Sequence, residues 1–199
     1  MWKADRFNGP KQPVVGVSWD NAQAYCKWAD ARLPTEAEFE YVLRGGDDRI
    51  FPWGNEYPPK TKCGNFADEF AKRQFPDGLK VKLALGDTVV DVMLEFKFIV
   101  PGYDDGYGLT APAGSFPANP FGLFDLEGNV CAWCADWYDK YPGSSATNDL
   151  FGQKARVLRG GSFVSSAYGL RCAGRFGRDP GLRGGDLGFR CVPLPGRGP

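Results

Sequence analysis

The chain has 199 residues, 43% of them hydrophobic, so it is long enough to bury one core. It carries 24 basic and 24 acidic side chains, and this balance argues against a protein built around nucleic-acid binding. No apolar run approaches the roughly 20 residues that span a bilayer. We expect no signal peptide in the first residues of this sequence, although a leader could have preceded them. Since 27 glycines and 16 prolines leave little room for long helices, we expect one soluble, loop-rich domain over residues 1–199.

Two helices are predicted in the first quarter of the chain. Small and apolar residues recur at helical spacing over residues 19–29, behind Ser18 as the N-cap. Thr35 and Glu38 form a capping box, in which each side chain satisfies an orphan backbone donor, and this predicts a helix over 36–43. A pair of glycines then ends this second helix.

An inserted β-hairpin is predicted at about residues 78–100. Apolar side chains alternate along this stretch, as in a pair of strands, on either side of a turn at Gly86 and Asp87.

The segment 156–191 shows neither helical spacing nor strand alternation. It therefore predicts loops that follow the surface of a core made elsewhere, where binding residues are often found. It contains seven arginines and two aspartates. In one interpretation arginines such as Arg159, Arg171 and Arg190 brace backbone carbonyls and carboxylates with their planar five-donor heads. The alternative is a patch that binds a polyanion.

Eight motifs lie in order along the chain: VGVSW at 15–19, ARLPTEAE at 31–38, PWGN at 52–55, YDDGY at 103–107, TAP at 110–112, NPFGLFD at 119–125, GNV at 128–130 and RGGS at 159–162. Together they resemble the formylglycine-generating-enzyme (sulfatase-modifying factor) domain family. This resemblance covers nearly the whole chain. It implies a C-type-lectin-like fold of the α+β class, with little regular structure and a core rich in Trp and Phe.

The ligands of both chemistries known for this family are missing from the positions that the resemblance assigns to them. Its oxidases bind copper through two cysteines shortly after the Gly-Gly-Ser motif and oxidise a substrate thiol. Alignment on 160–162 places Ser165 at the first of these positions, and a hydroxyl cannot replace a soft thiolate ligand. The related sulfoxide synthases need iron-binding histidines, and the chain has none. We therefore predict that the chain is not an enzyme and requires no cofactor. The alternative is an oxidase or modifying enzyme of the formylglycine-generating type.

The last segment is similar to the variable proteins of diversity-generating retroelements, in which scattered diversified positions lie between Arg-Val-Leu-Arg-Gly-Gly-Ser and Gly-Phe-Arg. There, adenine randomisation of Asn-type codons cannot produce Lys, Glu, Gln, Met or Trp, and residues 163–186 contain none of these five. A glycine-rich loop of this length can also lack them by chance. The candidate diversified, ligand-binding residues are Phe163, Val164, Ser165, Ser166, Tyr168, Gly169, Gly174, Phe176, Arg178, Asp179, Leu182, Gly184, Gly185 and Asp186.

Such a surface would act like an antibody paratope toward an unknown ligand, most simply a protein surface. Rigid aromatic side chains such as Tyr168 supply contact area, and hydroxyls such as that of Ser166 supply adaptable hydrogen bonds. We expect residues 163–186 to be mostly exposed on one face, while Gly160 and Gly161 hold the backbone. On this hypothesis, a partner or a further segment would attach the chain to a cell surface or to a virion.

Four of the six cysteines form candidate pairs. By the resemblance, Cys26 and Cys191 match a structural pair that joins the first helix to the last strand as a disulfide. Cys131 and Cys134 form a C-x-x-C motif, but neither a second such pair nor a histidine completes a zinc site.

The resemblance also implies a structural calcium ion. Asn65, the Phe66 carbonyl, Asp105 and the Tyr107 carbonyl match one of the family's sites, and these are the hard oxygen ligands that calcium prefers. The alternative is that these residues only hold turns.

Overall fold

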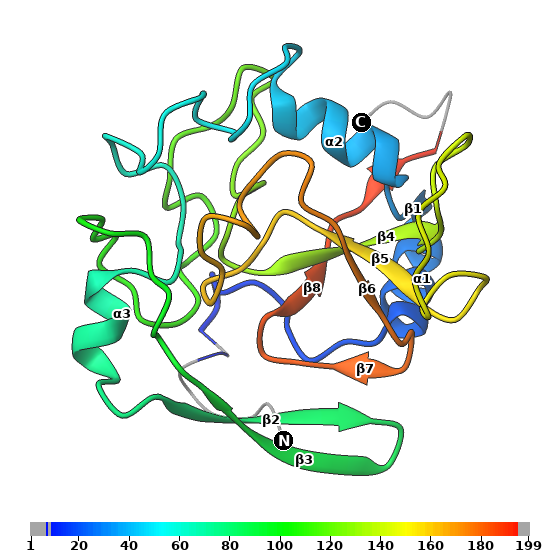
Figure 1. Cartoon of the computed structure of the whole chain (residues 1–199). Coiled ribbons are helices and arrows are strands. Elements are labelled where there is room, and N and C mark those ends of the chain that lie inside the picture. The colour runs from blue at the N-terminus through cyan, green and yellow to red at the C-terminus, as the bar shows by residue number, and fades with distance from the viewer. Residues whose placement is uncertain (1–6, 8, 195–199) are drawn as a thin grey trace.

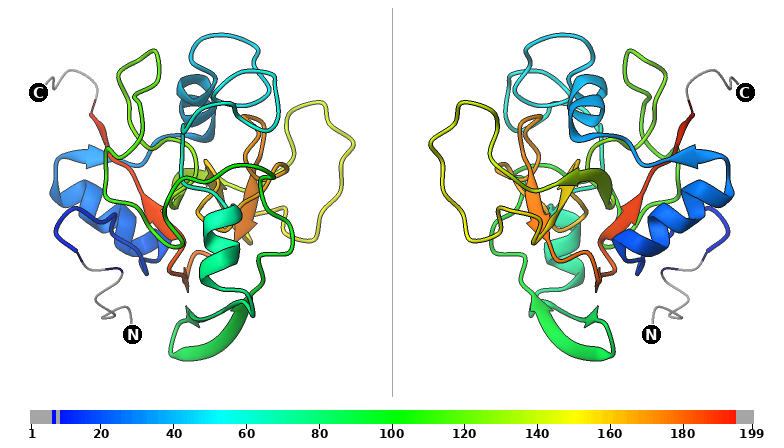
Figure 2. Two further views of the ribbon diagram at one scale, coloured as in Figure 1. Left: turned by 90° about the vertical axis from the view of Figure 1, so that its left-hand side faces the viewer. Right: turned by 90° about the vertical axis from the view of Figure 1, so that its right-hand side faces the viewer.

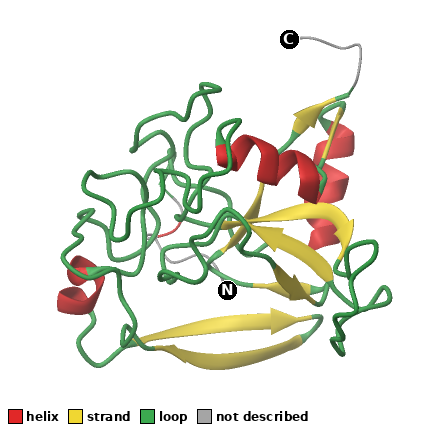
Figure 3. Ribbon diagram, turned by 45° about the horizontal axis from the view of Figure 1, so that its top comes forward, coloured by secondary structure: helices red, strands yellow, loops and turns green. Residues whose placement is uncertain are grey.

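The helices and strands of the chain are few and short, and loops make up much of the molecule (Figure 1, Figure 3). The computed structural model describes residue 7 and residues 9–194. Its elements are α1 (Trp19–Trp28), β1 (Ala31–Arg32), α2 (Glu36–Arg44), α3 (Glu69–Gln74), β2 (Leu79–Leu85), β3 (Thr88–Leu94), β4 (Cys131–Trp137), β5 (Arg156–Arg159), β6 (Phe176–Arg178), β7 (Leu182–Arg183), β8 (Leu187–Phe189) and β9 (Val192–Pro193).

The two helices predicted from capping signals form as expected. The Ser18 hydroxyl accepts from the backbone N–H of Asn21 at 3.2 Å, which satisfies an orphan donor of α1. Thr35 and Glu38 form the capping box of α2, and that helix ends at Gly45 with a left-handed φ of 66°. Helix α3 was not predicted. Its signal was Asp68, whose carboxylate accepts from the backbone N–H of Ala71.

The largest sheet has the order β6-β5-β4-β8, with β4 antiparallel to β5 and parallel to β8. Its central strand β4 carries Trp133, which is fully buried and donates its indole N–H to the carbonyl of Val17. One core cluster forms around Trp19 and Trp133 and a second around Phe39 and Leu43. Apolar burial in these clusters is the main force that holds the loops to the sheet.

Strands β2 and β3 form an antiparallel hairpin around Gly86 and Asp87, within the range given by the alternation. The hairpin lies at one side of the molecule together with α3 (Figure 2). Ala71 of α3 packs in one cluster with Leu79 and Phe96, so helix and hairpin share a small core of their own. That the hairpin is an insertion stays a prediction.

The hairpin is also joined to the last segment of the chain. Its strand β2 pairs with β7, with Ala84 opposite Arg183 and Leu85 opposite Leu182. The resulting sheet has the order β3-β2-β7. Residues nearly 100 positions apart therefore lie side by side here, as the lower part of Figure 1 shows.

Candidate ligand-binding surface

The segment after β5 runs through short strands and turns, and arginine side chains hold it in place. Arg159 is 0% exposed and donates to the carbonyls of Cys172 and Gly174 at 2.8 Å each. Its guanidinium also meets the Glu40 carboxylate at 2.5 Å and the Glu36 carboxylate at 3.6 Å. This arginine therefore ties the loop to helix α2.

Two more arginines of the segment brace the scaffold. The Arg175 guanidinium donates to the carbonyl of Asp139 and to the carboxylate of Glu36, both at 2.8 Å. Arg156 lies between the rings of Trp19 and Trp137, 3.7 and 3.5 Å from their centroids. Of the three arginines named for this bracing role, Arg159 contacts carbonyls and carboxylates and Arg190 donates to the carbonyl of Phe124. Arg171 instead contacts the ring of Tyr168, so for this residue the bracing role stays a prediction.

Glycine at position 160 is required by the path of the chain. Gly160 has a φ of 87°, and an added Cβ would lie 2.5 Å from the carbonyl oxygen of Leu126. Beyond it, the Ser165 hydroxyl accepts from the backbone N–H of Ser162 at 3.0 Å. The carbonyl of Ser165 accepts from the N–H of Ala67. The hydroxyl and the carbonyl of Ser165 therefore both help to fix the backbone of this loop.

The expectation that residues 163–186 are mostly exposed is wrong. Phe163 is only 1% exposed, and its N–H donates to the carbonyl of Asn129. Phe176 and Leu182 are half-buried and pack against the core cluster of Trp19 and Trp133. The reason is that the segment supplies β6, β7 and part of the sheet edge, so side chains on one side of each strand face inward.

Three of the glycines in the predicted set are also buried: Gly174, Gly184 and Gly185. An added Cβ would lie 2.9 Å from the Arg171 carbonyl at Gly174, and 2.6 Å from the Asp186 carboxylate at Gly184. Larger residues at these two positions would require the neighbouring chain to move. They therefore behave as scaffold rather than as projecting contacts.

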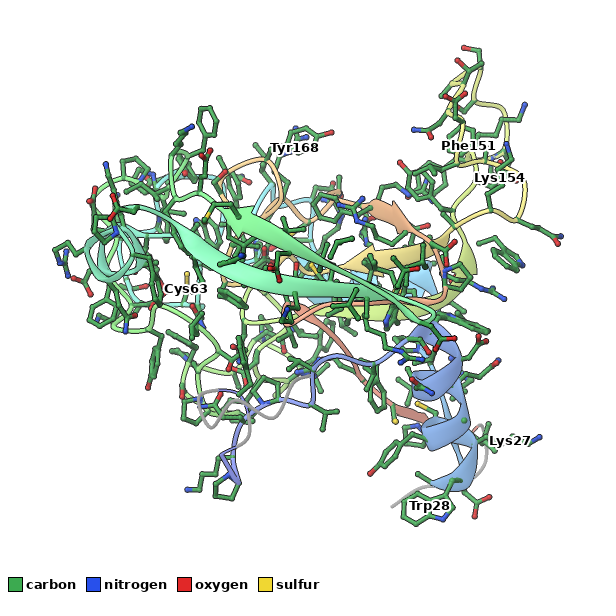
Figure 4. All side chains as sticks on the ribbon, turned by 90° about the horizontal axis from the view of Figure 1, so that it is seen from below. Lys27, Trp28, Cys63, Phe151, Lys154 and Tyr168 are labelled. Atoms are coloured by element: carbon green, nitrogen blue, oxygen red, sulfur yellow. The ribbon has the colours of Figure 1, made fainter. Side chains whose placement is uncertain are left out.

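The remaining predicted residues reach the surface to different degrees. Tyr168 is 69% exposed and points away from the ribbon (Figure 4). The central carbon of the Arg171 guanidinium lies 4.4 Å from the centroid of the Tyr168 ring. Arg178 and Asp179 are exposed as well. The half-buried members of the set are Val164, Ser165, Ser166, Gly169, Phe176, Leu182 and Asp186.

The four residues of the implied calcium site lie together. The Asp105 carboxylate accepts from the backbone N–H groups of Phe66, at 2.9 Å, and Tyr107, at 2.7 Å. Asn65 is fully buried, and its side-chain oxygen has no hydrogen-bond partner among the described residues. Burial and the nearby Asp68 carboxylate raise the pKa of Asp105 to about 7. The orphaned amide oxygen of Asn65 and the buried carboxylate that binds the N–H of the next residue, Phe66, are oxygen donors of the kind that calcium prefers.

The structure also brings Cys26 and Cys191 together, with their sulfur atoms 2.7 Å apart and both thiols free. Burial, and then the neighbouring Cys191, raise the pKa of the Cys26 thiol to about 12. The disulfide itself stays a prediction. Cys131 and Cys134 are three residues apart on β4 and belong to separate core clusters. These two thiols therefore do not converge on one site.

Cys172, the first cysteine after the Gly-Gly-Ser motif in the sequence, does not suit the copper pair that the resemblance implies. Cys172 is buried and its sulfur faces the carbonyl of Leu43 at 3.9 Å. Burial raises the pKa of this thiol to about 12, which disfavours the thiolate that binds metal.

In the described part of the chain, no helix is long and apolar enough to cross a membrane.

The chain is similar in sequence to formylglycine-generating enzymes and to an inactive relative of them. The chain is 37% identical to the formylglycine-generating enzyme of Bos taurus over 190 residues, which are 92% of this chain and 44% of that protein. It is 35% identical over 194 residues to the inactive C-alpha-formylglycine-generating enzyme 2 of Bos taurus, covering 94% of this chain and 52% of the relative. The chain thus spans about half the length of these relatives.

Among solved structures, the fold is shared with Treponema denticola variable protein 1, with a TM-score of 0.63 and 22% identity over 94% of this chain and 72% of that one. The fold is therefore C-type-lectin-like, as the resemblance implied. The prediction that the chain is not an enzyme is wrong, because proteins named formylglycine-generating enzyme match most of its length. A family model described as the sulfatase-modifying factor enzyme 1-like domain matches residues 3–194, and the chain belongs to this family.

Proposed function

We propose that the chain is a ligand-binding member of its family. In this proposal, side chains between residues 164 and 186 contact a protein ligand and are diversified by a retroelement. The contacting residues are those that reach the surface: Val164, Ser166, Tyr168, Gly169, Phe176, Arg178, Asp179, Leu182 and Asp186. Phe163, Gly174, Gly184 and Gly185 are left out because they are buried. Ser165 is left out because its hydroxyl and carbonyl both hold the loop.

One observation carries the proposal. The stretch 163–186 lacks all five residue types that adenine randomisation cannot produce. The same stretch presents exposed side chains, Tyr168 and Arg178 among them, on a backbone fixed by the buried Arg159. A diversified surface needs this separation of variable contacts from invariant scaffold, because each new sequence must still fold.

The DNA around the gene tests the proposal. A nearby repeat that is almost identical to the last coding segment and differs from it only at adenines, next to a reverse-transcriptase gene, is the expected finding. Differences at other bases, or no such repeat near the gene in any strain sequenced, would contradict diversification.

A second candidate function is favoured by the 37% identity to bovine formylglycine-generating enzyme, namely the oxidation of a cysteine in a substrate peptide. Two features argue against it: Ser165 offers a hydroxyl where the resemblance implies a thiol, and the Cys172 thiol faces the carbonyl of Leu43. The test is incubation of the purified chain with a cysteine-containing sulfatase peptide, followed by mass spectrometry. A product lighter than the peptide by the thiol-to-aldehyde change would favour this candidate.

We also propose that Asn65, Asp105 and the carbonyls of Phe66 and Tyr107 hold a structural calcium ion. Its support is the orphaned oxygen of Asn65 and the buried Asp105 carboxylate. Such an ion would fix the loop that lies next to Ser165 through Ala67. It would therefore stabilise the binding surface without contacting the ligand.

A further inference from the structure

A cavity of about 260 Å³ lies between the β2–β3 hairpin and the last segment of the chain. The hairpin contributes the apolar side chains of its inner face, Val81, Leu83, Val92 and Leu94. The opposite wall includes Phe163, Val164 and Leu182. Two of these, Val164 and Leu182, belong to the surface that we propose for ligand binding.

The hairpin is a fixed wall of this cavity, because it is held at both ends. Near its turn, Leu85 pairs with Leu182 of β7. At its other end, Leu79 packs with Ala71 of α3 and with Phe96. Alternation of side chains along β3 turns Val92 toward the cavity and Val89 toward the opposite face.

The size and chemistry of the cavity indicate what fills it. Pockets for small-molecule ligands usually enclose about 300–1,000 Å³, so a cavity of about 260 Å³ suits a single large side chain better. Its walls are mainly apolar, and the charged residues that line it are Arg178 and Asp186. Arg178 is exposed, and its guanidinium can only donate hydrogen bonds. It donates to the carbonyl of Gly177, and the Asp186 carboxylate lies close enough to interact with its charge. The remaining N–H groups of Arg178 are complemented by the backbone carbonyl oxygens of a peptide.

We propose that this cavity is the anchor pocket of the binding surface and receives one large apolar side chain, such as Leu or Phe, from a protein ligand. The hairpin supplies the invariant wall, and Val164 and Leu182 supply the variable one. Diversification then changes which side chain fits. This inference rests on the proposed function, because it assigns the pocket to that surface.

Capped amino acids test the pocket directly. N-acetyl-leucinamide and N-acetyl-phenylalaninamide are titrated into the full chain, with its valine and leucine methyl groups labelled with ¹³C for NMR. We expect saturable shifts at the methyl groups of Val81, Leu83 and Leu182, and none with N-acetyl-glycinamide. Shifts that are absent, or that spread evenly over the molecule, would overturn the proposal.

Two cavity-filling variants sharpen the result. Val164→Trp fills the pocket from the variable wall and Leu83→Phe from the hairpin, so a folded form of either should lose the saturable shifts. Val89→Trp, on the opposite face of the hairpin, is the matched control and should keep them. Binding that survives in a folded Val164→Trp or Leu83→Phe chain would place the probe elsewhere and overturn the proposal.

The outcome is separable from that of the proposed function. The titration uses the chain as it is and does not depend on diversification. If the near-identical DNA repeat is missing, diversification is refuted, but saturable shifts in the titration would still support the anchor pocket. Conversely, a template repeat with a negative titration would refute only the anchor pocket.

Discussion

Leu182, in the stretch proposed to vary, pairs with Leu85 at the tip of the β2–β3 hairpin, so a candidate contact residue is also part of a sheet. Backbone hydrogen bonds make this pairing, and they do not depend on which side chain occupies position 182. The framework can therefore stay fixed while the side chain changes. Residues that hold this framework and residues that are free to vary should therefore respond differently to substitution.

Phe163 and Tyr168 should respond oppositely to truncation. Phe163 is buried, and its replacement by Ala should cost roughly 3 to 5 kcal/mol of stability, because a large core side chain is lost. Tyr168→Ala should stay within about 0.5 kcal/mol, as is usual for exposed positions. Urea unfolding of both variants measures the difference. Equal losses would mean that Tyr168 holds the fold together.

Arg159→Ala should be strongly destabilising, by roughly 3 to 5 kcal/mol, because it leaves the buried part of an ion-pair network unmatched. The control is Arg73→Ala, which breaks a water-exposed pair with Asp104 and should hardly move the unfolding midpoint. Denaturant melts of the two variants test this, and a stable Arg159→Ala chain would refute the bracing role.

Glu127 should make stability depend on pH. It is buried, and neither carboxylate oxygen has a hydrogen-bond partner among the described residues. Burial raises the pKa of Glu127 well above its ordinary value in the folded chain. The folded state then holds the proton more tightly than the unfolded state. The stability contributed by the protonated group is complete below the unfolded pKa of 4.5 and is lost as the pH rises through the folded pKa.

Glu127→Gln keeps the shape and removes the charge, so it should raise stability at pH 8 and flatten the dependence above pH 4.5. Urea melts of both chains at pH 5 and pH 8 give the comparison. A variant that is less stable than the parent at pH 8 would show that the carboxylate is charged and satisfied in the folded state.

Calcium should raise the unfolding temperature of the chain, and the increase should grow with calcium concentration, because only the folded state assembles the site. Asp105→Asn should remove this effect, since the site loses its one carboxylate. Asp104→Asn, the exposed neighbour that pairs with Arg73, should leave it intact. A melting temperature that is the same with calcium and with a chelator would argue that these residues only hold turns.

The sequence was most informative where one local rule determines the structure. Ser18 and the Thr35 and Glu38 pair marked the two helix starts, because capping acts within a few residues. Helix α3 was missed, since its six residues carry an N-cap aspartate but no apolar stripe. The motifs identified the family, because they lie in the same order along the chain.

The exposure of residues 163–186 could not be predicted from local sequence rules. Strands β6 and β7 have three and two residues, too few to show an alternating pattern. The burial of Phe163 depends on contacts with Asn129 and on the cavity wall, which are distant in the sequence. The pairing of the hairpin with β7 is equally non-local, and so the sequence alone could not place the hairpin beside the candidate surface.

The most direct measurement of the account is selection from a displayed library in which Val164, Ser166, Tyr168, Arg178, Asp179 and Leu182 are randomised together. A matched library randomises six exposed positions of α1, namely Asp20, Gln23, Ala24, Tyr25, Lys27 and Trp28. We predict that the first library yields folded, specific binders to several unrelated purified proteins and that the α1 library yields far fewer. Equal yields from the two libraries, or loss of folding throughout the first, would contradict a binding surface built between residues 164 and 186.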